Sequence, residues 1–163
     1  MANITLTRVD NRLMHGQVIV KWTRVADCNR ILIVDDALKN DSFMVDIYKM
    51  AAPSGINVEL MSTQEAGNEY QKNQLGDGKI LLLFKTIASA SSAYKKGLLF
   101  PSLQLGGIPN EPGKIKIVTA VSTSPDEINK IKELHENGVD ITAQVIPEES
   151  KLNYDEIINR AGI

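Results

Sequence analysis

The chain has 163 residues, of which 43% are hydrophobic and 23% charged, and its formal net charge at pH 7 is −2. These values are typical of a globular protein with a hydrophobic core of its own, and we expect one domain over residues 1–163. The small net charge, without a basic run, argues against nucleic acid or an anionic membrane surface as a partner. Cys28 is the only cysteine, which excludes a disulfide framework and a Cys-x-x-Cys metal site and fits a reducing cytoplasm. The first residues lack the pattern of a signal peptide, and every apolar run is too short to span a bilayer.

Strand and helix patterns alternate along the chain. Short apolar or alternating runs predict strands at residues 4–9, 30–34, 56–61, 80–84, within 98–105, at 114–121 and at 140–145. Amphipathic spacing, capping residues and stop signals predict helices from residue 16 to about 25, from 41 or 42 to 52, at 62–73, from 87 to about 97, at 124–138 and at 153–161. This alternation predicts an α/β fold with a doubly wound, mostly parallel sheet and helices on both faces.

The connection before the sixth predicted strand is short and rich in glycine and proline. Parallel neighbours need a crossover of a dozen or more residues, so we expect residues 114–121 to run antiparallel to the fifth strand. The segment from Gly106 to Lys114 superficially resembles a nucleotide phosphate loop, but its spacing differs and two prolines interrupt it. We therefore interpret Gly106 and Gly107 as a turn at the rim of the site.

A histidine between two arginines and the start of a helix marks the candidate site. His15 follows the first strand, at the edge where open α/β sheets hold ligands. An imidazole nitrogen is both a good nucleophile toward phosphorus and a good leaving group, which suits a phosphoryl relay. Arg8 and Arg12 offer planar forks of donors for phosphoryl oxygens. Gly16 and Gln17 open the helix, where free amides and the positive end of the helix dipole attract an anion.

Further polar residues near this edge have less defined roles. Asp10 would repel a phosphoryl group, and it could instead fix the tautomer of His15 or hold an arginine in place. Lys85 and Thr86 follow a central strand and could contact the phosphoryl group. An acidic pair at residues 35–36 is more typical of a strand end than of a magnesium site. We expect neither a metal nor a cofactor.

Residues 8–18 and the following Trp22 and Thr23 resemble the IIB components of the mannose family of bacterial sugar phosphotransferase systems, which includes mannose, fructose, sorbose and N-acetylgalactosamine branches. The resemblance extends through residues 34–36, 82–84 and 105–108 to the last strand and helix. It implies a seven-stranded, mostly parallel sheet. It also implies a phosphocarrier whose histidine accepts a phosphoryl group from a IIA component and passes it to a sugar bound in the membrane components IIC and IID.

Residue by residue, the resemblance places the phosphohistidine at His15 and the phosphate-stabilising arginine at Arg12, while Arg8 and Asp10 also match the motif. No IIA portion precedes the motif, so we expect a stand-alone IIB chain, located in the cytoplasm at the inner face of the membrane through IIC and IID. Asn11 and the pair at 22–23 are somewhat more similar to the N-acetylgalactosamine branch than to the mannose branch.

Several points stay open at this stage. The sugar, the phosphorylated imidazole nitrogen, the surface that meets IIA and the formation of a homodimer cannot be derived from the residues. A different class of function, a non-catalytic regulatory module that binds phosphate or another anion reversibly, uses the same loop. An acid-phosphorylated receiver fits poorly, because the acidic pair follows the second strand rather than the first.

Overall fold

The computed structural model describes residues 1–162. The strands are β1 (Asn3–Asp10), β2 (Arg30–Val34), β3 (Asn57–Met61), β4 (Lys79–Phe84), β5 (Ser102–Gly107), β6 (Ile115–Val118), β7 (Val121–Thr123) and β8 (Asp140–Ala143). The helices are α1 (Gly16–Ala26), α2 (Asp36–Lys39), α3 (Ser42–Met50), α4 (Thr63–Asn73), α5 (Ile87–Lys95), α6 (Pro125–Glu136) and α7 (Tyr154–Ala161). The predicted alternation is confirmed, and only the one-turn helix α2 was not anticipated among the helices.

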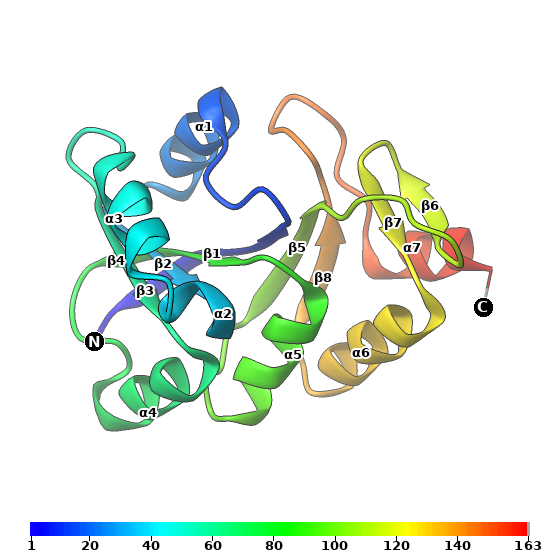
Figure 1. Cartoon of the computed structure of the whole chain (residues 1–163). Coiled ribbons are helices and arrows are strands. Elements are labelled where there is room, and N and C mark those ends of the chain that lie inside the picture. Colours follow the sequence, from blue (N-terminus) through cyan, green and yellow to red (C-terminus); the bar gives the residue numbers. More distant parts are fainter. Residues whose placement is uncertain (163) are drawn as a thin grey trace.

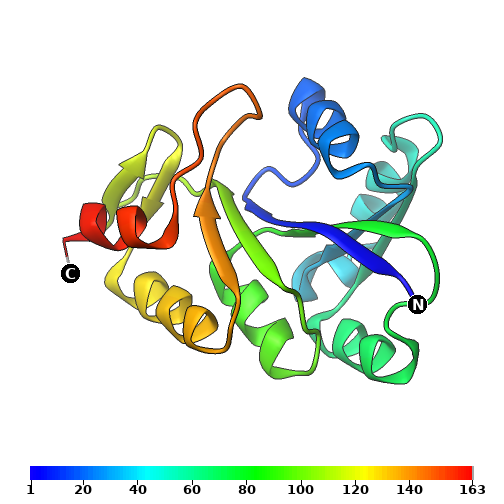
Figure 2. The same ribbon diagram turned by 180° about the vertical axis from the view of Figure 1, so that it is seen from behind.

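A parallel sheet forms the centre of the molecule, in the strand order β3-β2-β4-β1-β5-β8 (Figures 1 and 2). All of its strand pairs run parallel. In Figure 1, α1 and α3 lie above the sheet, whereas α4, α5 and α6 lie below it. The doubly wound α/β architecture with helices on both faces is therefore confirmed.

The central strands are buried on both faces, which explains their continuous apolar runs. Along β2, Ile31 and Ile33 pack in the core between the sheet and α1, which also contains Trp22. Leu32 and Val34 pack in the core on the opposite face, between the sheet and α4, α5 and α6. Alternate residues of β4 divide between the two cores in the same way. The sheet is thus a rigid base that fixes where its loops emerge.

The segment 114–121 differs from the prediction. The chain turns back at Ala120, whose φ is +71°, and divides the apolar run into β6 and β7, which pair antiparallel with each other. Only β7 reaches the main sheet, through a parallel bridge between Ile108 and Val121. Over residues 1–162 the main sheet accordingly has six strands rather than the expected seven, and β6 pairs with β7 instead of β5. Ile117 on β6 is buried in the core that also contains residues of α7. This packing, instead of pairing in the main sheet, holds β6 against the rest of the domain.

The connections of neighbouring strands diverge at the carboxyl end of β1. This strand lies between β4 and β5. The chain leaves β1 for α1 on one face of the sheet, whereas it leaves β4 for α5 on the other face. Adjacent strands whose connections diverge in this way form the ligand crevice of open α/β sheets. In the part of the chain that the structure describes, no helix is long and apolar enough to cross a membrane.

Candidate functional site

His15 lies at the point where the loop after β1 becomes α1. It is the N-cap residue, with an extended backbone (φ −132°, ψ 103°), and its side chain is exposed. Gly16 follows with φ +47°, a conformation that favours glycine, and the space around it is open. Among the described residues no side chain caps α1, so the first amides of the helix, at Gly16 and Gln17, are left to bind an anion.

The loop is anchored from beneath by Leu13. Its φ is +56°, a left-handed conformation that costs a residue with a side chain roughly 1–2 kcal/mol. The side chain is only 3% exposed and packs in the core that contains Ile19 and Trp22. The backbone N–H of Leu13 also donates to the carbonyl oxygen of Asp10 at 2.9 Å. Burial of one apolar side chain thus holds the turn that presents His15.

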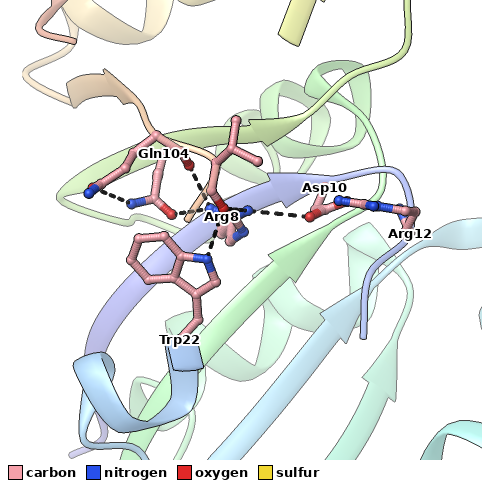
Figure 3. Close-up of polar contacts among 7 residues, drawn as sticks. Arg8, Asp10, Arg12, Trp22 and Gln104 are labelled. Carbon is pink, nitrogen blue, oxygen red and sulfur yellow. Dashed lines mark hydrogen bonds and ion pairs between the residues drawn. The ribbon is translucent and has the colours of Figure 1, made fainter. Parts of the chain in front are cut away.

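Asp10 connects the two arginines of the motif (Figure 3). Its carboxylate is buried; Oδ1 accepts the backbone N–H of Arg12 at 3.0 Å and lies 3.5 Å from Arg12 Nε. Its other oxygen, Oδ2, accepts from Arg8 Nη2 at 3.4 Å. Across residues 1–162 the contacts of this carboxylate are with the arginines and not with His15. Of the two roles that the sequence left open, the geometry favours holding an arginine.

Arg12 is the arginine that faces solvent. Its side chain is 41% exposed, and only Nε faces Asp10. The Nη1 and Nη2 groups form no hydrogen bond with any described residue, so the outer edge of the guanidinium is free to bind an anion with two parallel donors. Arg12 and His15 lie on the same loop, three positions apart.

Arg8 lies beneath the loop instead of at its surface. The residue is 1% exposed, and its guanidinium stacks on Trp22, with Cζ 4.7 Å from the ring centroid. Nη1 donates to Gln104 Oε1 and to the carbonyl oxygen of Gln144, and Nη2 donates to Asp10 and to the carbonyl oxygen of Val145. Burial lowers the pKa of Arg8 to about 10, so it stays charged at neutral pH. This placement differs from the expectation that Arg8 holds phosphoryl oxygens, because those donors are already occupied.

The end of β4 lies beside the end of β1. Val9 pairs with Phe84, so the following Lys85 and Thr86 reach the same edge of the sheet as the His15 loop. Thr86 is the N-cap of α5, and its hydroxyl accepts the N–H of Ser89 at 3.0 Å. This hydroxyl has a structural task, whereas Lys85 is exposed and available to an anion.

The acidic pair after β2 also has structural tasks. Asp35 caps α2 by accepting the N–H of Leu38 at 2.9 Å. Asp36 accepts from the backbone N–H and the hydroxyl of Thr63 at 2.8 and 3.0 Å, and these bonds lower the pKa of Asp36. Both interactions agree with the interpretation of this pair as a strand end.

Sequence reasoning missed the residues that enclose Arg8 and Asp10. The glycine pair is the end of β5 and not a turn: a Cβ on Gly106 would lie 2.1 Å from Arg8 Cζ, and one on Gly107 would lie 2.5 Å from Asp10 Oδ1. Two adjacent glycines inside a buried strand indicate a close approach of another group, and this signal was available. The partners Gln104, Gln144 and Val145 carry no local signal.

Comparisons with known proteins identify the family of this chain. The family model described as PTS system sorbose subfamily IIB component matches residues 4–163. The chain belongs to this family. This IIB component is 33% identical to the sorbose-specific EIIB component of Klebsiella pneumoniae over 159 residues, which cover 98% of this chain and 97% of the relative. It is also similar to the crystal structure of manxB from Thermoanaerobacter tengcongensis, with a TM-score of 0.91, 34% identity and coverage of 98% and 97% of the two chains.

The comparisons do not favour the N-acetylgalactosamine branch that Asn11 and the pair at 22–23 suggested. The N-acetylgalactosamine-specific IIB component 2 of Escherichia coli is 29% identical over 158 residues, covering 97% of this chain and 100% of the relative. The sorbose-specific relative is more similar, at 33%. Membership of the family makes this IIB component part of a sugar phosphotransferase system, and the sugar itself is left open.

Proposed function

We propose that this IIB component is a phosphocarrier that accepts a phosphoryl group on His15 from a IIA phosphohistidine and transfers it to a hexose or amino sugar during uptake. The observation that carries the proposal is the exposed imidazole of His15 at the uncapped first turn of α1, on a loop braced by buried residues. Membership of a IIB family of the sugar phosphotransferase systems supports a role in sugar phosphotransfer.

Each half of the relay conserves atoms and charge. In the first half, the lone pair of a neutral His15 ring nitrogen forms a bond to phosphorus, the P–N bond of the donor breaks, and its electron pair returns to the donor imidazole. In the second half, a sugar hydroxyl oxygen attacks phosphorus, the P–N bond to His15 breaks, and the imidazole recovers its lone pair. The hydroxyl proton leaves with a neighbouring base or with the released imidazole.

The surrounding groups stabilise the transferred charge. Phosphoryl transfer depends mainly on positioning and on electrostatic stabilisation of the equatorial oxygens. Arg12 supplies the free edge of its guanidinium, and the amides of Gly16 and Gln17 supply backbone donors at the positive end of α1. Lys85 adds a positive charge at the same edge. Thr86 caps α5, and Asp10 holds the arginines in place through its carboxylate.

The partners follow from the family. IIB components work with a IIA protein and with the membrane components IIC and IID, and we propose the same partners for this chain, in the cytoplasm at the inner face of the membrane. Such a role needs the phosphoryl site to be reachable by a folded donor. The exposed His15 and Arg12 meet this requirement.

The decisive test is intact mass spectrometry after incubation with phosphoenolpyruvate, the general phosphotransferase proteins and a matching IIA. We expect one added phosphoryl group that acid removes, because phosphohistidine is acid-labile. The chain has two histidines, which makes His135→Gln the matched control for His15→Gln. His135 stacks on Tyr154, with ring centroids 3.6 Å apart, at the contact of α6 with α7.

The two variants separate the alternatives. The His135→Gln protein should gain the phosphoryl group as the unmodified chain does, whereas the His15→Gln protein should gain none while keeping its fold. If the unmodified chain binds phosphate but never forms the adduct with a IIA that is active on another IIB, the reversible anion-binding module replaces the carrier.

A further inference from the structure

A continuous set of charged hydrogen bonds runs from the segment after β8 to the phosphoryl loop. The carbonyl oxygens of Gln144 and Val145 accept from Arg8 at 2.8 and 2.7 Å, and Val145 also accepts from Trp22 Nε1 at 3.2 Å. Arg8 then contacts Asp10, which contacts Arg12 through its other oxygen. Figure 3 shows Arg8, Asp10 and Arg12 in this order along β1 and the loop.

Arg8 has little freedom to leave this position. Four hydrogen bonds engage its two Nη groups, and Trp22 covers one face of the guanidinium. The absence of a side chain at Gly106 leaves room for the guanidinium that no larger residue would leave. A group so enclosed cannot swing to the exposed loop without breaking these four hydrogen bonds, each of which the charge of the guanidinium strengthens.

We propose that Arg8 is a positioning residue, which is fixed by the backbone of residues 144–145 and, through Asp10, holds Arg12 in the orientation that receives the phosphoryl group. This inference rests on the proposed function of His15. It assigns to the segment after β8 a part in phosphoryl transfer, although that segment is more than 100 positions from His15 in the sequence. An ion pair also joins this segment to α1, with Lys21 Nζ 3.0 Å from Glu148 Oε1.

The alternative role for Arg8 is an independent contact with the phosphoryl group, and a double-mutant cycle distinguishes the two. Arg8→Lys keeps the charge, but a single ammonium cannot span two carbonyl oxygens and Asp10 together. We expect this change to lower the maximal rate of transfer from phosphorylated IIA about 10-fold, with little change in KM, because the effect falls on the oriented transition state. In an Arg12→Ala background the same change should alter the rate less than about 2-fold.

Arg30→Lys is the matched control for a loss of stability alone. Arg30 also donates to a carboxylate and a backbone carbonyl, Glu59 Oε1 at 2.8 Å and Leu75 O at 2.7 Å, and it is partly buried. Arg30 begins β2 and pairs with Ile80 on β4, which in turn pairs with Ile4 near the start of β1. Arg30 therefore lies at the edge of the sheet opposite His15, which follows the other end of β1. This variant should lose stability and keep the transfer rate.

A milder variant keeps the test decisive if Arg8→Lys fails to fold. Gln104→Met removes one acceptor of Arg8 with little change in volume and should lower the maximal rate in the same direction, again only when Arg12 is present. Equal fold-losses in both backgrounds would overturn the positioning role and indicate direct contact. A rate loss as large in Arg30→Lys would also overturn it. Absence of any adduct on the unmodified chain would instead reject the proposed function.

Discussion

Replacing Arg12 by lysine separates the chemistry of this residue from its charge. Asp10 Oδ1 lies 3.5 Å from Arg12 Nε and leaves the outer edge of the guanidinium free. A lysine ammonium is a single point charge that Asp10 would attract, so it cannot also bridge two phosphoryl oxygens. One charge-assisted hydrogen bond and part of a second would be lost, about 2–3 kcal/mol of transition-state stabilisation. At 1.36 kcal/mol for each factor of ten, transfer should slow about 30- to 160-fold.

The same change should hardly affect folding. The Arg12 side chain is 41% exposed, and lysine keeps a positive charge beside the buried carboxylate of Asp10. The assay is single-turnover transfer from ³²P-labelled phosphorylated IIA by rapid quench, with urea unfolding alongside. Arg24→Lys, at an exposed arginine in the last turn of α1, is the control and should transfer at the original rate. Equal rates for Arg12→Lys and Arg24→Lys would refute the assignment of Arg12 to the phosphoryl oxygens.

Three further experiments test the packing and the charges of the fold. Gly106→Ala should lower the free energy of unfolding by about 3 kcal/mol or more, through the clash with Arg8, whereas Gly113→Ala, with φ +88° in open space, should cost about 1 kcal/mol in a urea titration. Asp36→Asn should reduce stability at neutral pH, because the pKa of Asp36 is lowered on folding. The stability deficit relative to the unmodified chain should disappear as pH falls below 3.8, and a deficit that stays unchanged would contradict this. Burial raises the pKa of Cys28, so iodoacetamide should modify it more slowly in the folded chain than in urea at pH 8, and equal rates would count against its burial.

The strands and most helices could be predicted because their signals are local. The runs at 30–34 and 80–84 are apolar on both faces, as central parallel strands require, and Ser62 with Glu65 forms the capping box that starts α4. The split of residues 114–121 into a hairpin was not predictable in this way. The turn at Thr119 and Ala120 contains none of the glycine or asparagine residues that favour positive φ in tight hairpins.

The site was predictable to the level of its loop but not of its individual contacts. His15, Gly16 and Arg12 lie, as predicted, on the loop between β1 and the uncapped first turn of α1. The alternation of β1 puts Arg8 and Asp10 on one face, but it cannot tell whether that face is open or covered. The cover comes from residues 144–145, whose bonds to Arg8 join positions far apart in the sequence and depend on the assembled sheet.

The most direct test of the carrier role follows the phosphoryl group to its acceptor. The chain is loaded with ³²P from phosphorylated IIA, freed of donor, and mixed with vesicles that contain the IIC and IID components and candidate sugars. We predict that the label leaves His15 and appears in sugar phosphate with one phosphoryl group transferred for each one lost, and that His135→Gln protein behaves alike. As a control, the same vesicles must accept label from another IIB component of the same sugar specificity. With such vesicles, label that stays on the protein or is released only as inorganic phosphate would contradict the carrier role.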